Sequence, residues 1–509
     1  MNSLFQVVTS KIIALDANIE QVQVIDHYTV NQAEVFITST GKYLIKEPHL
    51  EQNEFQIYEK IMDHLMNSLP FLDKLETEEE RIHHLEKYIW QDAQEKGIIH
   101  QVSQFYDRLK YYIVREVLGY GVFDVLMNDD DIEEILIERH DTDVGVIHRK
   151  HSEMHILDTN IVIGKSSLMD SYTQRLVQKT GKSVTVAKPI MDGTTRTKHR
   201  IMVIYGKEVS DNGSTVSIRK FPSKPYTITH LLQFGTISKL MAAYVWMLID
   251  AKAFGILVGE TGSGKTTLIN SLMTMANPRW RIITIEETPE LQIPQKRTVS
   301  LHTRSSPLVK SDNDIGIMDL IKATLRMRPD FVIVGEVRGK EANEMFQSAA
   351  TGHGGLSSIH GSDIRSALTR LAAEPINIKL SQQMLLWFAI HSTTLKGMDG
   401  KTMRRIKTLT EINPTDTGIE TTDLFSFDRK NNDFGLNDIE ELVKKSKRLG
   451  YVADLFGIDP VTDMEKRMAL LDTCIEKKAY EVSDVFNILR QYYQFYPTVK
   501  NSNIHMSNL

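Results

Sequence analysis

Between residues 237 and 373, short apolar runs alternate with longer stretches of helical apolar periodicity. The apolar runs predict buried strands at 254–258, 281–286, 331–334 and 355–360. The stretches between them predict helices at 265–275, 316–327, 339–350 and 363–373. This alternation of strand and helix predicts an α/β fold in which helices cover a parallel sheet.

The pattern changes on both sides of this region. Upstream, strand-like and helical runs are mixed, which predicts an α+β N-terminal part, and two prolines in "PSKPYTITHLLQFGT" predict a linker. Downstream, short strands are followed by spaced Leu, Ile, Val and Tyr, which indicate helices. The predicted order is an α+β segment at 1–100, an α+β domain at 101–222, a linker at 223–236, an α/β domain at 237–428 and a small helical tail at 429–509.

Composition narrows the class of protein. A chain of 509 residues is longer than a single hydrophobic core usually supports, which agrees with several domains. The net charge is −6 without a basic cluster, so no direct nucleic-acid partner is expected. No apolar run approaches the about 20 residues of a membrane span, and "MNSLFQVVTSKIIALD" lacks the features of a secretory signal. We expect a cytoplasmic protein, one that meets a membrane only peripherally if it works at one, with its single cysteine, Cys474, buried as a small hydrophobe.

One glycine-rich segment, "GILVGETGSGKTTLIN", carries the clearest chemistry. It satisfies G-x-x-x-x-G-K-[ST] between a predicted buried strand and a predicted helix, the setting of a phosphate-binding loop. Backbone N–H groups and the helix N-terminus bind phosphate, the lysine reaches the β- and γ-phosphates, and the following hydroxyl ligates Mg²⁺. The predicted ATP-binding residues are Gly259, Glu260, Thr261, Gly262, Ser263, Gly264, Lys265, Thr266 and Thr267.

Carboxylates at two later strand ends predict hydrolysis. "RIITIEETPEL" ends a strand at Glu286, and "LRMRPDFVIVGEVRG" ends another at Gly335-Glu336. A carboxylate at the tip of a strand beside the phosphate loop can orient or deprotonate the attacking water. Glu336 is therefore the predicted catalytic base and, with Thr266, a predicted Mg²⁺ ligand, while Glu286 is the second carboxylate. Glu287 and Glu290 fit solvent-exposed strand ends better.

A third strand contributes histidines. In "TGHGGLSSIH", His360 is predicted at the strand tip, where it can hydrogen-bond the γ-phosphate and report its loss. His353 precedes the same strand, and for it a local structural role and a functional one are equally open.

Four segments in this order resemble one family: the phosphate loop, "TIEETPEL", "RPDFVIVGEVRGKEA" and "TGHGGLSSIH". Together they are similar to the secretion ATPases of type II secretion, type IV pili and type IV secretion. "VSIRKF" and "AAYVWMLIDA" bring the chain closest to the archaeal branch, which includes archaellum motors. The chain departs from the family where "MDGTTRTKHR" stands for its usual "LPDGSR", and where Glu286-Glu287 stands for Glu-Asp.

The resemblance implies a homohexamer with ATP and Mg²⁺ bound between subunits. Each chain would contribute a mobile, PAS-like N-terminal domain and a RecA-like P-loop motor domain. His353 and His360 carry over as members of the family's His box. Glu286, Glu336 and His360 carry over as catalytic residues. So does Arg219, which matches an arginine that approaches the nucleotide and stabilises phosphoryl charge. Arg338 carries over as a sensor of the neighbouring subunit.

The implied function is ATP hydrolysis that drives assembly or secretion of pilin-like or archaellin-like subunits through a polytopic membrane platform protein. The alternative is a nucleic-acid translocase on the same RecA-like core, which salt-sensitive DNA binding would reveal. A non-hydrolysing, nucleotide-gated scaffold is a third hypothesis.

Overall fold

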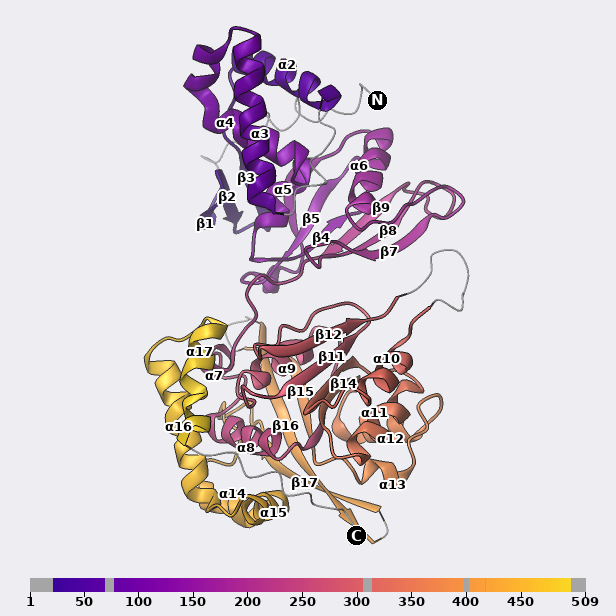
Figure 1. Cartoon of the computed structure of the whole chain (residues 1–509), viewed down its shortest axis with the longest axis vertical. Helices are drawn as coiled ribbons and strands as arrows, with labels where there is room; N and C mark the ends of the chain where they lie inside the picture. The colour runs from indigo at the N-terminus through magenta and orange to yellow at the C-terminus, as the bar shows by residue number, and fades with distance from the viewer. Residues whose placement is uncertain (1–21, 69–76, 305–313, 398–401, 417, 496–509) are drawn as a thin grey trace. The chain divides into compact units, whose positions relative to one another are not determined.

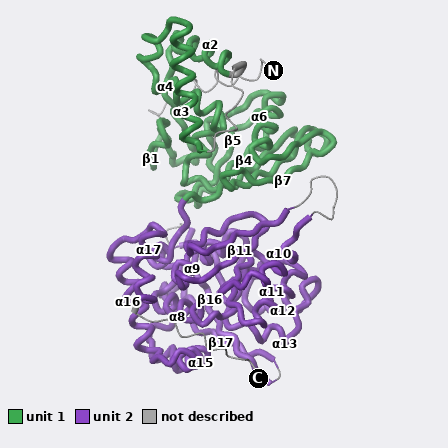
Figure 2. The backbone as a smooth tube through the Cα atoms, viewed as in Figure 1, with its two compact units in different colours: residues 1–223 green, residues 224–509 purple. Residues whose placement is uncertain are grey.

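The chain folds into two compact units, residues 1–223 and 224–509 (Figure 2). The structure is a computed structural model that describes residues 22–68, 77–304, 314–397, 402–416 and 418–495. The N-terminal stretch considered as a signal and the end of the predicted tail, 496–509, lie outside the described residues.

Unit 1 contains a nine-stranded sheet in the order β1-β2-β3-β6-β5-β4-β9-β8-β7. Every neighbouring pair is antiparallel except β3 and β6. The strands are β1 (Val24–Val30), β2 (Ala33–Thr38), β3 (Lys42–Lys46), β4 (Ile132–Ile137), β5 (Asp143–His148), β6 (Leu157–Val162), β7 (Ile190–Thr194), β8 (Arg200–Ile204) and β9 (Thr215–Arg219). The pairing of β3 with β6 joins residues 1–100 and 101–222 in one sheet, so the structure does not separate them at residue 100.

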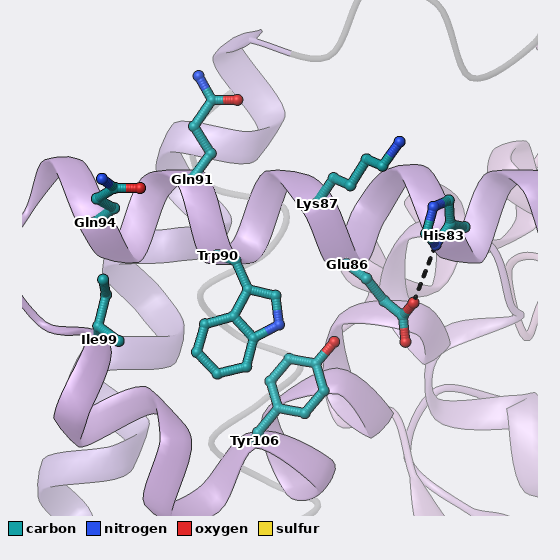
Figure 3. Close-up of a pocket in the computed structure, with 8 residues that line it drawn as sticks. All are labelled: His83, Glu86, Lys87, Trp90, Gln91, Gln94, Ile99 and Tyr106. Carbon is teal, nitrogen blue, oxygen red and sulfur yellow. Dashed lines mark ion pairs between the residues drawn. The ribbon is translucent and has the colours of Figure 1, made fainter.

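The helices of unit 1 are α2 (Gln52–Ser68), α3 (Glu78–Glu95), α4 (Ile99–Val117), α5 (Asp124–Asn128) and α6 (Ser166–Gln178). Helices α2, α3 and α4 share one apolar core, whereas α5 and α6 pack with the sheet in another. Along α3 and α4 lies a surface pocket of about 620 Å³, where Trp90 stacks on Tyr106 at 4.7 Å and His83 faces Glu86 (Figure 3).

Unit 2 contains an eight-stranded sheet in the order β12-β11-β13-β14-β10-β15-β16-β17. The first six strands are parallel, and β16 and β17 extend the sheet antiparallel. The strands are β10 (Phe254–Gly259), β11 (Arg281–Glu286), β12 (Arg297–His302), β13 (Phe331–Glu336), β14 (Gly354–His360), β15 (Phe388–Lys396), β16 (Thr402–Thr415) and β17 (Gly418–Ser426). The predicted α/β fold with a parallel sheet is confirmed.

Helices cover both faces of this sheet (Figure 1). One face packs on α10 (Ile317–Thr324), α11 (Glu341–Ala350) and α12 (Ile364–Ala372), with the short α13 (Leu380–Gln383) nearby. The other packs on α7 (Ile228–Gln233), α8 (Lys239–Asp250) and α9 (Lys265–Met273). Helix α7 falls within the predicted linker, where Ile228 and Leu231 are buried in the core of unit 2.

The predicted helical tail joins the same core. Its helices are α14 (Ile439–Lys445), α15 (Lys447–Phe456), α16 (Pro460–Glu476), α17 (Val482–Leu489) and α18 (Gln491–Phe495). Helices α15 and α16 pack against α8, and every residue of α8 from Leu240 to Ile249 is buried. A helix that is apolar all round needs cover on all sides, and the tail supplies it. Cys474 on α16 is buried, as predicted.

Within the described residues, the structure has no helix that combines the length and apolarity of a bilayer span.

Candidate active site

The phosphate loop connects the central strand β10 to α9. All six residues of β10 are buried. Gly262 and Gly264 then adopt φ values of +75° and +89°. Residues with a Cβ rarely adopt this left-handed conformation, so the two glycines permit the tight turn that leads directly into α9. Backbone N–H groups in such a turn, together with a helix N-terminus, form a concave anion-binding surface. The loop therefore fits a nucleotide phosphate.

Lys265 is the charged group of the loop. Its Nζ donates to the carbonyl oxygens of Gly259 at 3.0 Å and Glu260 at 2.8 Å. Burial lowers the pKa of Lys265, although Glu336 and Glu290 act in the opposite direction. Among the described residues no carboxylate lies within ion-pair distance of this ammonium group, so its charge is available to an anionic ligand.

Glu336 ends β13 at the same edge of the sheet. Arg338 binds its carboxylate with two hydrogen bonds, from Nε to Oε1 at 2.9 Å and from Nη2 to Oε2 at 2.8 Å. His360 Nε2 lies 3.0 Å from Oε1. Burial raises the pKa of Glu336, but Arg338, His360 and Lys265 together bring it below its ordinary value. Glu336 is therefore an ionised carboxylate beside the loop.

His360 connects this carboxylate to the phosphate loop. It is the last residue of β14, and its backbone is in register with Gly259 on β10. Burial and Lys265 lower the pKa of His360, whereas Glu336 raises it, with a net decrease. Its imidazole is therefore neutral at neutral pH, and it can either donate or accept a hydrogen bond.

Glu286 takes a different position from Glu336. It is 5% exposed at the end of β11, and its Oε1 accepts hydrogen bonds from the amides of Glu290 at 2.9 Å and Leu291 at 3.0 Å. A Cβ on Gly335 would lie 3.1 Å from Glu286 Cγ, so glycine before Glu336 leaves room for this side chain. The structure thus brings both predicted carboxylates to adjacent strand ends, with Glu286 ordering the loop that follows it.

Known proteins of one family are similar to this chain. The family model for type II/IV secretion system proteins matches residues 163–390. A protein of Methanocaldococcus jannaschii is 28% identical over 483 residues, which cover 89% of this chain and 85% of the relative. A second protein of that organism is 36% identical over 258 residues, covering 50% of this chain and 93% of the relative. The chain belongs to the type II/IV secretion system protein family. It is an ATPase of the type II/IV secretion class.

Among solved structures, the chain is similar to the ATPase DotB of Legionella pneumophila. The sequence identity is 14%, the TM-score is 0.41, and the alignment covers 71% of this chain and 92% of DotB.

His353, one of the residues suggested by the secretion-family resemblance, lies away from the phosphate loop. His353 precedes β14, at the opposite end of the strand from His360, and its Nδ1 lies 2.9 Å from Thr351 Oγ1. A seven-residue strand places them about 20 Å apart. Arg219 ends β9 in unit 1, where its Nε donates to Glu134 Oε1 at 2.8 Å.

Sequence reasoning missed two residues at the loop of this secretion ATPase. Ser392 on β15 donates from Oγ to Ser263 O at 2.5 Å, and Arg404 on β16 donates from Nε to Gly262 O at 3.0 Å. Strand β15 was not predicted, and the strand predicted from residue 403 does not by itself place Arg404 beside the loop.

The described residues contain no group of three or more His, Cys, Asp or Glu side chains arranged to hold a metal ion. Thr266, in the first turn of α9, and Glu336 supply only oxygen donors, the type that Mg²⁺ prefers. Mg²⁺ usually takes one or two protein ligands together with substrate phosphates and water, so this donor set fits a nucleotide-bound ion.

Proposed function

We propose that the chain is the motor subunit of a secretion or pilus-type machine, and that it hydrolyses ATP with Glu336 as the base. The observation that carries this proposal is the contact between His360 and Glu336 beside the phosphate loop. His360 Nε2 lies 3.0 Å from the ionised carboxylate of Glu336, and the backbone of His360 pairs with Gly259, the first residue of the loop.

The proposed chemistry divides among three kinds of group. The loop amides and Lys265 bind the triphosphate and stabilise negative charge that develops during phosphoryl transfer. Glu336 orients the attacking water and accepts its proton. Thr266 and Glu336 would hold Mg²⁺, which when bound neutralises phosphate charge.

Arg338 restrains the proposed base in this arrangement. Its two hydrogen bonds occupy both carboxylate oxygens of Glu336, and it also lies 3.6 Å from Glu287. A carboxylate paired in this way is a weak proton acceptor, because the arginine stabilises its ionised form. We propose that Arg338 moves away from Glu336 before water is activated, and that contact with a neighbouring subunit drives this movement.

The wider assignment follows from family membership. We propose a homohexamer at the cytoplasmic face of a membrane, with Arg219 of one subunit completing a nucleotide site. The ring would act on a polytopic platform protein that assembles pilin-like or archaellin-like subunits. Analytical ultracentrifugation with and without nucleotide tests the ring. A chain that stays monomeric in every nucleotide state, yet hydrolyses ATP fully, would contradict it.

Glu336→Gln tests the base directly. The substitution keeps the shape of the side chain and removes its basicity, so kcat for ATP hydrolysis should fall at least about a hundredfold. ATP binding should persist, because the loop and Lys265 are unchanged. The matched control is Glu440→Gln, which removes an exposed carboxylate on α14 and should leave turnover unchanged. Wild-type turnover in the Glu336→Gln chain would show that the base is another group.

A further inference from the structure

Two side chains from β15 and β16, the strands that follow β10 in the order of the sheet, donate hydrogen bonds to the phosphate loop. Arg404 Nε donates to Gly262 O, and Ser392 Oγ donates to Ser263 O. The accepting carbonyls are consecutive in the loop, whereas the donors follow them by 142 and 129 residues. They belong to β16 and β15, and β15 pairs with β10 directly before the loop.

Packing distances show that the loop and these strands are in direct contact. A Cβ on Gly264 would lie 3.3 Å from Arg404 Cδ. A Cβ on Gly259 would lie 2.4 Å from the backbone oxygen of Ser392. The absence of a Cβ at these loop glycines therefore lets the loop pack closely against β15 and β16, and it also permits the turn conformation.

The hydrogen bonds have a consequence for phosphate binding. A loop cradles phosphate when its N–H groups converge, which requires the intervening carbonyls to point elsewhere. A carbonyl that accepts a hydrogen bond from outside is held in that orientation. Arg404 is a charged donor, so its hydrogen bond to the loop is charge-assisted and stronger than one from a neutral donor.

We propose that Arg404 is a positioning residue for nucleotide binding, which holds the Gly262 carbonyl outward and raises the affinity of the loop for the phosphates. Ser392 acts in the same way at the next carbonyl. This inference rests on the proposed function of the loop. It predicts an effect on nucleotide affinity and not on the chemical step, because Arg404 contacts the loop and not Glu336.

The experiment measures ADP affinity by isothermal titration calorimetry, and KM and kcat for ATP, on the full chain. Arg404→Ala should weaken ADP binding and raise KM about tenfold, the effect of losing one charge-assisted hydrogen bond. At saturating ATP, kcat should stay within about twofold. Arg404→Lys keeps a donor and the charge and should recover much of the affinity. The control is Arg429→Ala, because Arg429 is also exposed and donates from Nη2 to a backbone carbonyl, that of Lys396, at 2.7 Å.

Hydrogen exchange provides the second readout. In nucleotide-free Arg404→Ala, the amides of residues 260–266 should exchange faster, while those of α16 should exchange as in the wild type. Unchanged ADP affinity in Arg404→Ala, or a fall in kcat with unchanged KM, overturns the inference. A wild-type chain that binds ADP normally but never hydrolyses ATP would overturn the proposed function instead, and the ADP comparison would still decide the role of Arg404.

Discussion

Arg467 on α16 allows a quantitative test of how the C-terminal helices are joined to the motor unit. Its side chain is 1% exposed and binds two buried carboxylates, with Nε 2.7 Å from Asp463 Oδ2 and Nη1 2.7 Å from Asp250 Oδ2. Its Nη2 donates to the hydroxyl of Tyr492 at 2.7 Å. Asp250 ends α8, so Arg467 is one of the side chains that link this helix to the tail.

Arg467→Met removes the charge but keeps much of the apolar volume. Two carboxylates are then left buried without their cation. Loss of one partner of a buried ion pair costs about 3–5 kcal/mol, so we expect unit 2 to lose about 4 kcal/mol of unfolding free energy at pH 8. Hydrogen bonds from Tyr492 and Tyr493 to the same carboxylates limit the loss.

The loss should depend on pH in a defined direction. Burial raises the pKa of Asp250, and Arg467 at present opposes that increase. Without the arginine the folded-state pKa rises further above the unfolded value. An acid with a raised folded pKa destabilises the fold most above that pKa, and the penalty shrinks as pH falls toward the unfolded pKa. The difference between Arg467→Met and wild type should therefore be smaller at pH 5 than at pH 8.

Urea unfolding of the full chain, followed by tryptophan fluorescence, measures this difference. Trp246 reports on the region, because the Arg467 guanidinium lies 4.9 Å from the centre of its ring, and Trp246→Phe identifies its transition. The control is Lys445→Met, which breaks an exposed ion pair with Glu441 on α14 and should change stability by less than about 0.5 kcal/mol. The reasoning fails if both substitutions shift the midpoint equally, or if the Arg467→Met deficit grows toward pH 5.

Four further outcomes are expected. Gly335→Ala should lower kcat about tenfold with little change in KM, because its Cβ would displace the hydrogen-bonded Glu286, and steady-state kinetics checks this. The lowered pKa of Glu336 keeps the base ionised and that of His360 keeps its ring neutral, so a pH–rate profile should show kcat nearly flat from pH 7 to 8, with activity lost in acid. Burial raises the pKa of Cys474 to about 12, so iodoacetamide should modify the native chain at least about a hundredfold more slowly than the urea-unfolded chain, as mass spectrometry can follow. Chelation of Mg²⁺ should abolish phosphate release, and added Mg²⁺ should restore it.

The sequence predicts the strands of the parallel core well where they are continuous apolar runs. The runs at 254–258 and 281–286 correspond to β10 and β11 within one residue. The edge strand β12, "RTVSLH", escaped prediction because polar residues interrupt it and it is only partly buried. Strand β15 was not predicted because its apolar residues directly follow those of "QQMLLW". Such a short apolar run does not by itself distinguish a helix from a strand.

The sequence by itself determined the phosphate loop, because a turn from strand to helix depends on consecutive residues such as Gly262 and Gly264, whose backbone conformations are local. It also indicated Glu336 and His360 as strand-end residues, since parallel strands end at one edge of a sheet. Only the tertiary structure decided that Arg404 lies on the loop and that Arg467 joins the tail to α8. These contacts depend on which distant strands and helices pack together, and that choice follows from burial over the whole unit, which no local pattern encodes.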